Sequence, residues 1–268
     1  MNRRKYIKQT FWGITGLGLF SGLYTWQIEP FWLEIVKLKM PIRNLPENLV
    51  GKTLMQISDI HIGDMFDYHF IIDSFKKAKE LEPDFVVYTG DYVSLSNDEV
   101  QYDKLQETLK NIVHGRLGTL GILGNHDYGI NWSQISIANN IADKLEQSGI
   151  KVLRNQSIEL NGINPEKAMN GFDKTKANIA LCHNPDVCDL DIWRDYNSWI
   201  LSGHTHGGQV KPPFLRPPML PVKNKKYSAG QIELNNGRTL YINRALGHLW
   251  QVRFNVRPEI TIFELQQA

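Results

Sequence analysis

The first half of the chain alternates short apolar runs with amphipathic stretches. Three apolar runs have the length and composition of buried strands: 53–58, 84–89 and 118–123. Three other segments place apolar residues at the spacing of one helical face: 70–81, 100–113 and 132–148. Strands that alternate with helices in this order predict a layered α/β domain.

The second half of the chain has a more strand-like pattern. Four apolar runs there predict further strands: 178–182, 198–202, 239–242 and 259–265. The stretch 211–226 is rich in proline and lysine and predicts a surface loop.

The N-terminal segment differs from the rest of the chain. Four basic residues open it: Arg3, Arg4, Lys5 and Lys8. No charged side chain follows from Gln9 to Ile28, a length close to the roughly 20 residues that span a bilayer as a helix. Positive charge before the span predicts that the first residues stay cytoplasmic. We therefore expect 1–28 to be a single transmembrane helix in a bacterial membrane, with the following domain on the extracytoplasmic side.

Two alternatives stay open for this segment. The run 2–8 also resembles a twin-arginine export signal, but no alanine precedes Ala78 to supply an A-x-A cleavage site. The segment could also be an interfacial helix of an intracellular protein. In each case we expect 29–49, which contains two helix-breaking prolines, to be a tether whose apolar residues could pair as an edge strand. The main domain is then 50–268.

The composition is that of a globular chain, with 42% hydrophobic and 22% charged residues among 268. A formal net charge of +2 is too small to indicate nucleic-acid binding, and we expect none. Two cysteines, Cys182 and Cys188, are too few for a disulfide framework. We expect two buried or half-buried thiols, with a single disulfide as the alternative outside the cytoplasm.

Five short polar blocks each follow an apolar run. They are Asp59-Ile60-His61, Gly90-Asp91, Gly124-Asn125-His126-Asp127, His183-Asn184-Pro185-Asp186 and Gly203-His204-Thr205-His206. Each block alone is compatible with an ordinary turn. Together they supply carboxylate, imidazole and amide donors for two neighbouring ions, and their lack of cysteine argues against structural zinc. Because strand ends gather at one edge of an α/β sheet, we expect a two-metal site for Mn, Fe, Zn or Ni.

The ordered series D-x-H, G-D, G-N-H-D, H and G-H-x-H resembles the calcineurin-like metallophosphoesterase family. The tail 253–260 is similar to one branch, the membrane-anchored phosphodiesterases related to UDP-2,3-diacylglucosamine pyrophosphatases. The resemblance implies a four-layer α/β/β/α fold, in which two β-sheets pack face to face as a sandwich and helices flank them on the outside.

The resemblance also implies the ligands of two divalent metal ions. One ion is assigned to Asp59, His61, Asp91 and His206, and the other to Asp91, Asn125, His183 and His204. Asp91 then bridges the two ions, as its two carboxylate oxygens allow. Such a pair of ions clamps phosphoryl oxygens and lowers the pKa of the water between them.

His126 and Asp127 are the catalytic residues that the resemblance implies. His126 would hydrogen-bond a phosphoryl oxygen or protonate the leaving group, since imidazole titrates near neutral pH. Asp127 would hold the other ring nitrogen of His126 and keep the imidazole charged. Arg244 and Arg253 could bind a second phosphate, but we expect them to form ion pairs at the edge of the core.

We therefore expect a metal-dependent hydrolase that cleaves a phosphodiester or pyrophosphate bond with a metal-activated hydroxide. The branch resemblance implies a nucleotide-lipid substrate of the UDP-2,3-diacylglucosamine type, and hence a part in lipid A biosynthesis. A general phosphodiesterase acting on envelope phosphates is an alternative. The rival from another class is a metal-binding envelope protein with little or no activity. No pattern in the sequence indicates an oligomeric state.

The chain departs from the family pattern at two places. Between Asn155 and His183 it is short where relatives carry an additional strand, so we expect a missing strand or a rearranged sheet that could move His183. Ala245 stands where relatives commonly have glycine. If that position needs a positive φ, alanine costs about 1 kcal/mol or more.

Overall fold

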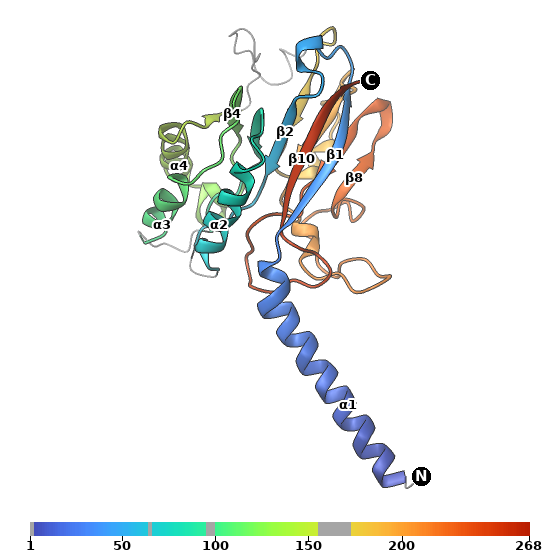
Figure 1. Cartoon of the computed structure of the whole chain (residues 1–268). Coiled ribbons are helices and arrows are strands. Elements are labelled where there is room, and N and C mark those ends of the chain that lie inside the picture. Colours follow the sequence, from blue (N-terminus) through green and yellow to red (C-terminus); the bar gives the residue numbers. More distant parts are fainter. Residues whose placement is uncertain (1–2, 64–65, 95–99, 155–172) are drawn as a thin grey trace.

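The computed structural model describes residues 3–63, 66–94, 100–154 and 173–268. Two β-sheets pack face to face, α-helices cover the first sheet, and helix α1 (Arg3–Leu23) projects from one end of the domain (Figure 1). This mixed α/β architecture confirms the two-sheet part of the predicted fold.

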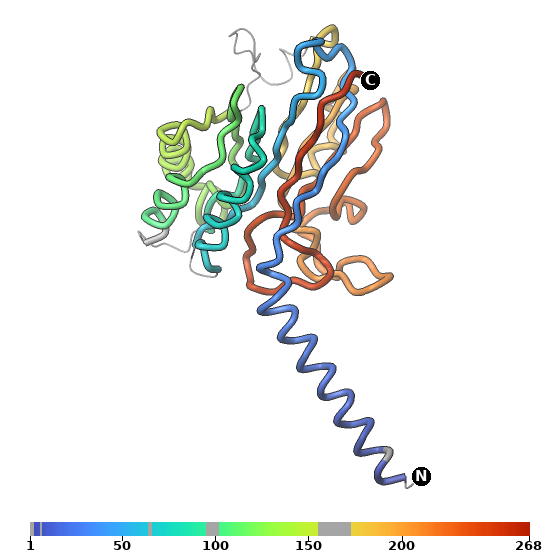
Figure 2. The backbone as a smooth tube through the Cα atoms, viewed as in Figure 1, coloured from blue at the N-terminus to red at the C-terminus, as the bar shows by residue number. Residues whose placement is uncertain are grey.

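The first sheet has six strands in the order β1-β10-β2-β3-β4-β5. Their bounds are β1 Glu34–Ile42, β2 Thr53–Ile57, β3 Phe85–Tyr88, β4 Gly118–Gly121, β5 Lys151–Val152 and β10 Glu259–Gln267. Neighbours from β2 to β5 are parallel, whereas β10 is antiparallel to β2 and parallel to β1. Figure 2 shows β1 and β10 side by side, although they come from opposite ends of the chain.

Three helices lie over one face of this sheet, as the amphipathic segments predicted: α2 (Tyr68–Lys79), α3 (Val100–Leu109) and α4 (Ile135–Gln147). Their apolar residues share one core with the buried side chains of β2 and β3. Helix α2 begins earlier than the apolar spacing indicated, because the Asp67 carboxylate accepts the His69 N–H at 3.0 Å and caps the helix.

The second sheet has four strands in the order β6-β7-β9-β8. Their bounds are β6 Ile179–Leu181, β7 Trp199–Ser202, β8 Gly230–Glu233 and β9 Thr239–Ile242. Strands β6, β7 and β9 are parallel, and β8 is antiparallel to β9. The apolar pattern did not predict β8, because this edge strand carries one large apolar residue, Ile232, and alternates between half-buried and exposed positions.

The interior alternates along the strands as a sheet sandwich requires. Phe85 and Phe263 of the first sheet meet Trp199 and Tyr241 of the second in a shared core. Ile200, the neighbour of Trp199, points to the opposite face and joins a separate cluster. One sheet-facing core and two outer cores therefore hold the layers together.

The outer helical layer predicted over the second sheet needs correction. After Val152, the helical segments in the described part of the chain are 3₁₀ turns such as Pro185–Asp189 rather than α-helices. Loop residues cover that face instead, with Trp193 and Tyr227 packed in the same cluster as Ile200. The Asn184 side chain accepts the Asp186 N–H and Pro185 follows directly, which favours a short turn here.

The prediction of a transmembrane helix within 1–28 is wrong. Among the described residues, none of the helices combines the length and the apolar character that crossing a bilayer requires. Helix α1 includes the four basic residues and ends at Leu23, where a π-helical turn begins.

Three smaller expectations can be compared with the structure. Segment 29–49 contributes β1, so the first sheet includes residues from before Val50. Cys182 is half-buried and Cys188 is buried, and both are free thiols as predicted. The strand expected to be missing or rearranged falls largely on 155–172, which lies outside the described residues.

Candidate metal centre

The polar blocks meet where the two sheets share an edge. Strands β2, β3 and β4 are parallel, so the loops that follow them leave the first sheet on the same side. Strands β6 and β7 are also parallel and end just before His183 and His204. The Gln56 side-chain amide donates to the Ser202 carbonyl at 2.9 Å, which ties β2 to β7 at this edge.

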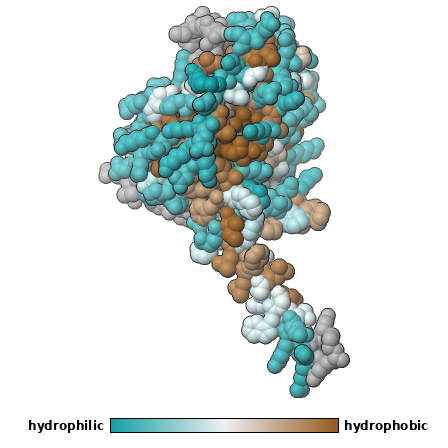
Figure 3. Space-filling model, viewed as in Figure 1, coloured by the Kyte–Doolittle hydropathy of each residue, from teal (hydrophilic) through white to brown (hydrophobic). Residues whose placement is uncertain are grey.

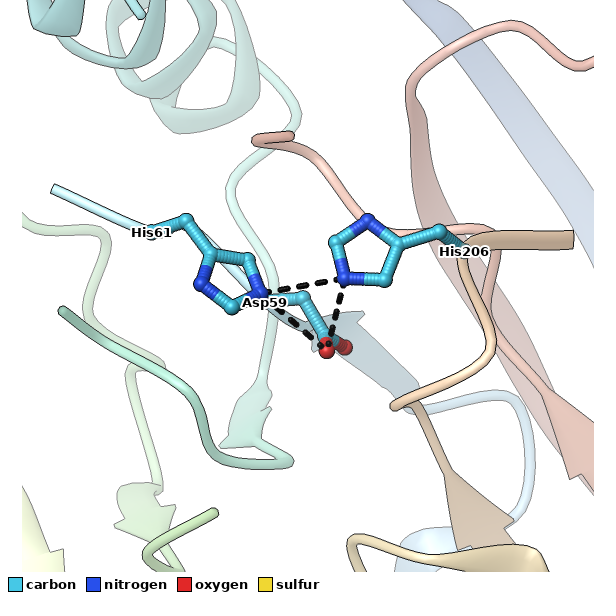
Figure 4. A group of neighbouring side chains, drawn as sticks. All are labelled: Asp59, His61 and His206. Atoms are coloured by element: carbon cyan, nitrogen blue, oxygen red, sulfur yellow. Dashed lines mark hydrogen bonds and ion pairs between the residues drawn. The ribbon is translucent and has the colours of Figure 1, made fainter. Parts of the chain in front are cut away.

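Three buried residues form the first ligand group, which we call the Asp59 group: Asp59, His61 and His206 (Figure 4). The Nε2 atom of His206 lies 3.4 Å from Asp59 Oδ1, and the Nε2 atom of His61 lies 3.7 Å from the same oxygen. The two Nε2 atoms are 3.0 Å apart. Ligand atoms from two sheets therefore converge on one point.

A second group of ligand atoms lies next to the first, and we call it the His183 group: Asp91, His183 and His204. The Nε2 atom of His183 lies 3.0 Å from Asp91 Oδ2 and 3.2 Å from His204 Nδ1. Asn125 joins this group, because its Oδ1 is 3.1 Å from His183 Nε2. His204 and Asn125 are only half-buried, so this group is open to solvent on one side.

Asp91 lies between the two groups. Its Oδ2 atom is 3.0 Å from His183 Nε2 and 3.6 Å from His61 Nε2, while its Oδ1 accepts the His126 N–H at 2.8 Å. This is the position that a carboxylate shared by two ions needs. The structure also keeps His183 beside His204, so the short segment before it does not move this imidazole out of the site.

In three of the four ligand histidines, the second ring nitrogen has a partner that directs the first one to the centre; His206 Nδ1 is buried without a hydrogen-bond partner. His183 Nδ1 lies 2.8 Å from the Thr89 carbonyl, and His204 Nε2 lies 3.1 Å from the Pro221 carbonyl. A carbonyl only accepts, so each of these nitrogens carries a proton, and the other nitrogen of each ring is the one that faces the centre. His61 Nδ1 is 2.8 Å from a serine hydroxyl. Metal-binding histidines are oriented by contacts of this kind.

The two central carboxylates are ionised because imidazoles face them. Burial opposes ionisation, but the His206 and His61 rings hold the pKa of Asp59 well below its usual range. Likewise, His183 outweighs burial and lowers the pKa of Asp91 to about 2. Two buried carboxylates that stay charged form a centre that stabilises cations.

The surroundings shift the pKa values of the imidazoles in different directions. Burial lowers the pKa of His206 and of His204, which favours the neutral imidazole that binds metal ions. Burial would lower the pKa of His183 too, but the Asp91 carboxylate raises it to about 10. A cation beside Asp91 would compete with that proton, so binding there would release it.

Five of the candidate ligands have a left-handed backbone, which is unusual for residues other than glycine. The φ angles are 52° at Asp59, 46° at His61, 55° at Asp91, 69° at His204 and 52° at His206. Such conformations cost about 1–3 kcal/mol each, persist only when the surrounding contacts enforce them, and cluster at functional sites.

Glycines in two of the blocks make room for the carboxylates. A Cβ atom on Gly203 would lie 2.1 Å from Asp59 Oδ2, and one on Gly124 would lie 2.1 Å from Asp91 Oδ1. Any side chain at these positions would displace a central carboxylate. The sequence showed these glycines as neighbours of ligands, and the structure gives the steric reason.

The His126 residue next to Asn125 is half-buried. Its ring centroid is 4.9 Å from that of His61 and 6.4 Å from that of Trp132, a largely exposed side chain. Burial, assisted by His61, lowers the pKa of His126, so the prediction of a charged imidazole is wrong. A neutral imidazole in this place can donate one hydrogen bond to a bound molecule.

Asp127 does not make the contact we expected with the His126 ring. Its buried carboxylate instead accepts four backbone N–H groups: Asp91 at 3.0 Å, Tyr92 at 2.8 Å, Val93 at 3.3 Å and Gly124 at 2.8 Å. Its position in the 3₁₀ turn His126–Tyr128 directs the carboxylate to the neighbouring loop rather than to the imidazole. Asp127 therefore fixes the loops that carry Asp91 and Asn125.

Arg253 supports the centre in a way that the sequence did not reveal. This fully buried guanidinium donates to the Arg244 carbonyl at 2.9 Å and the Gly247 carbonyl at 2.8 Å. The Gly247 N–H in turn donates to the Asp59 carbonyl at 2.8 Å. The expected ion pairing applies to Arg244, which contacts Glu259 and Glu34, whereas Arg253 braces the loop behind the Asp59 group.

The donor set fits divalent cations. Both groups offer carboxylate oxygens and imidazole nitrogens, Asn125 adds an amide oxygen, and no thiolate takes part. Mn, Fe, Zn and Ni accept this mixture of ligands. The structure thus contains two candidate metal-binding sites that share Asp91 as a neighbour.

Comparison with known proteins gives consistent matches. The family model described as calcineurin-like phosphoesterase matches residues 52–208. Phosphodiesterase YaeI of Escherichia coli is 28% identical, covering 99% of each chain. The uncharacterized metallophosphoesterase YkuE of Bacillus subtilis is also 28% identical, over 100% of this chain and 99% of its own. UDP-2,3-diacylglucosamine pyrophosphatase LpxG of Chlamydia muridarum is 26% identical, over 93% of this chain and 94% of its own.

Proposed function

The chain belongs to the calcineurin-like phosphoesterase family, and we propose that it uses two metal ions to hydrolyse a phosphodiester or pyrophosphate bond. Its family and its relatives make it a metal-dependent hydrolase. The observation that supports the two-ion reading is the convergence of two ligand groups on either side of Asp91.

In this proposal the Asp59 group holds one divalent cation, the His183 group with Asn125 holds the other, and Asp91 faces both. Cations bound there supply Lewis-acid polarisation of phosphoryl oxygens and lower the pKa of a nearby water. The chain contributes two ionised carboxylates and imidazole nitrogens that already face the centre. With two negative charges against two divalent cations, the centre stays positive and attracts a phosphate anion.

We assign to His126 the hydrogen bond to a phosphoryl or leaving-group oxygen. Its imidazole is half-buried, and its ring centroid lies 4.9 Å from that of His61 and 6.4 Å from that of the exposed Trp132. The lowered pKa keeps the ring neutral, so it acts as an N–H donor that needs no prior protonation. The ring needs no carboxylate partner for this role.

For the substrate, we propose a nucleotide-lipid pyrophosphate of the UDP-2,3-diacylglucosamine type, as in lipid A biosynthesis. Similarity to LpxG over nearly the whole chain supports this choice. Similarity to the phosphodiesterase YaeI supports a simple phosphodiester as the competing substrate. The metal we propose to test first is manganese, because oxygen and imidazole ligands suit it.

The test uses the full chain, stripped with a chelator and reloaded with Mn²⁺, acting on bis-p-nitrophenyl phosphate and on the nucleotide lipid. We expect His126→Ala to lower turnover about 10²–10⁴-fold while its metal content stays that of the wild type. His114→Ala, an exposed histidine outside the site, is the matched control and should change neither quantity. A wild type that binds metal but hydrolyses neither substrate would favour the inactive metal-binding rival.

A further inference from the structure

The proline- and lysine-rich stretch 211–226, which we call the rim loop, borders the metal centre. Its Pro221 carbonyl lies 3.1 Å from His204 Nε2. Its Pro217 packs so closely on Gly208 that a Cβ there would be 2.3 Å from the Pro217 Cβ. Pro221 of the rim loop therefore lies next to the His183 group, and Pro217 lies next to Gly208.

The tip of the rim loop exposes large apolar side chains to solvent. Phe214 is 106% exposed relative to a reference residue, and Leu215 and Met219 are each 64% exposed. The same loop contains five basic residues and no acidic one: Lys211, Arg216, Lys223, Lys225 and Lys226. Lys211 and Arg216 flank the apolar tip in the sequence, and apolar side chains next to cations are typical of surfaces that bind anionic lipid.

A second exposed apolar segment lies on the same side of the molecule. Trp250 is 59% exposed, and its carbonyl accepts a hydrogen bond from Gln209, which precedes the rim loop. The neighbouring Arg253 N–H donates to the Thr25 carbonyl at 2.9 Å, just after helix α1. The rim loop, the Trp250 segment and the end of α1 are thus linked at one edge, where Figure 1 places the base of the domain.

Helix α1 adds to this pattern. Large apolar side chains such as Phe11, Trp12 and Phe20 are more than half exposed along it, and its first residues are basic. Figure 3 shows apolar surface along α1 where it leaves the domain, and hydrophilic surface toward its N-terminal end. Both the helix and the rim loop therefore combine apolar side chains with basic residues, and the apolar part of the helix is the part next to the domain.

We propose that the edge containing the metal centre docks on an anionic lipid bilayer, with Phe214 and Leu215 of the rim loop inserted at the boundary of headgroups and acyl chains. This inference rests on the proposed function and refines it: the phosphoester substrate is presented by the membrane, with its acyl chains remaining in the bilayer. Docking of this kind uses the interfacial surface and requires no membrane-spanning helix.

Vesicle binding of the full chain tests the docking directly. Phe214→Ser/Leu215→Ser should lower binding to phosphatidylglycerol-containing vesicles about tenfold or more in co-sedimentation. The matched control is Val50→Ser/Leu117→Ser, which removes two side chains that are 45% and 51% exposed. These residues precede β2 and β4, whereas the candidate metal ligands follow the strands at their other ends. Both double variants keep α1, so its contribution cancels. Wild-type binding by the Phe214/Leu215 variant would overturn the proposal, as would equal wild-type binding to pure phosphatidylcholine vesicles.

Activity measurements separate docking from catalysis. The Phe214/Leu215 variant should hydrolyse bis-p-nitrophenyl phosphate at the wild-type rate, because neither residue belongs to the metal centre. Its turnover of the nucleotide lipid embedded in vesicles should fall in proportion to the loss of binding. A wild type with no turnover of either substrate, together with the expected loss of vesicle binding, would refute the proposed function and leave the docking surface standing.

Discussion

The two ligand groups of this protein differ in how they meet solvent. In the Asp59 group, Asp59, His61 and His206 are all buried. In the His183 group, His204 and the adjoining Asn125 are half-buried. We infer that the first group is the closed side of the centre and that a phosphate approaches from the second.

Both groups are supported by main-chain and by side-chain contacts. Behind Asp59, the Gly247 N–H donates to the Asp59 carbonyl, and the Arg253 guanidinium braces the same loop. In the His183 group, the Gly203 N–H donates to the His183 carbonyl, and the Asp127 carboxylate accepts the Asp91 N–H. Solvent exposure, rather than the kind of support, is therefore the difference that mutation can test.

The largest effect should come from the residue that faces both groups. Asp91→Asn removes the charge from the carboxylate shared by the two sites, and turnover of bis-p-nitrophenyl phosphate should fall at least about a hundredfold. Asp59→Asn removes the charge from one group only. Elemental analysis should show that Asp91→Asn loses both metal equivalents and Asp59→Asn loses one.

Circular dichroism and thermal unfolding of the two variants supply the control, because both substitutions keep side-chain size. Equal metal loss from Asp91→Asn and Asp59→Asn, with the fold retained in both, would contradict the central position of Asp91. It would also remove the reason to treat the two groups as distinct.

A smaller, kinetic effect is expected on removing metal from the unmodified chain. A chelator should extract one equivalent several-fold faster than the other, because the half-buried His204 and Asn125 leave the His183 group accessible. In His204→Ala the fast phase should disappear, since that site is already weakened. Release in a single phase from the wild type would show that exposure does not distinguish the groups.

The positions of the candidate ligands followed from the sequence for a simple physical reason. Polar residues placed after apolar runs lie at strand ends, and parallel strands bring their ends to one edge. The contacts of Asp127 and Arg253 could not be predicted in this way. Both side chains bind main-chain N–H or carbonyl groups. Every residue type carries a main-chain carbonyl and nearly every one an N–H, so the sequence does not show which residues these side chains will contact.

Two errors in the fold have different explanations. The absence of charge over 9–28 suggested a membrane span, but an uncharged segment need not be apolar. Helix α1 contains glycine, threonine and glutamine besides its basic residues, and it is not apolar enough to cross a bilayer. The outer helical layer was inferred from the resemblance alone, and loop residues cover that face of the second sheet in the described part of the chain.

The smallest predicted effect concerns the loop behind the closed group. Ala245 is buried and has φ 70°, the strained conformation anticipated for a position where relatives commonly have glycine. Ala245→Gly should therefore stabilise the protein by up to about 1 kcal/mol, measured by urea unfolding, with metal content unchanged. Ala138→Gly, at an equally buried position inside helix α4, is the matched control and should destabilise by about 1 kcal/mol. Loss of stability in both variants would mean that packing of the Ala245 methyl group in the loop behind Asp59 outweighs the backbone strain.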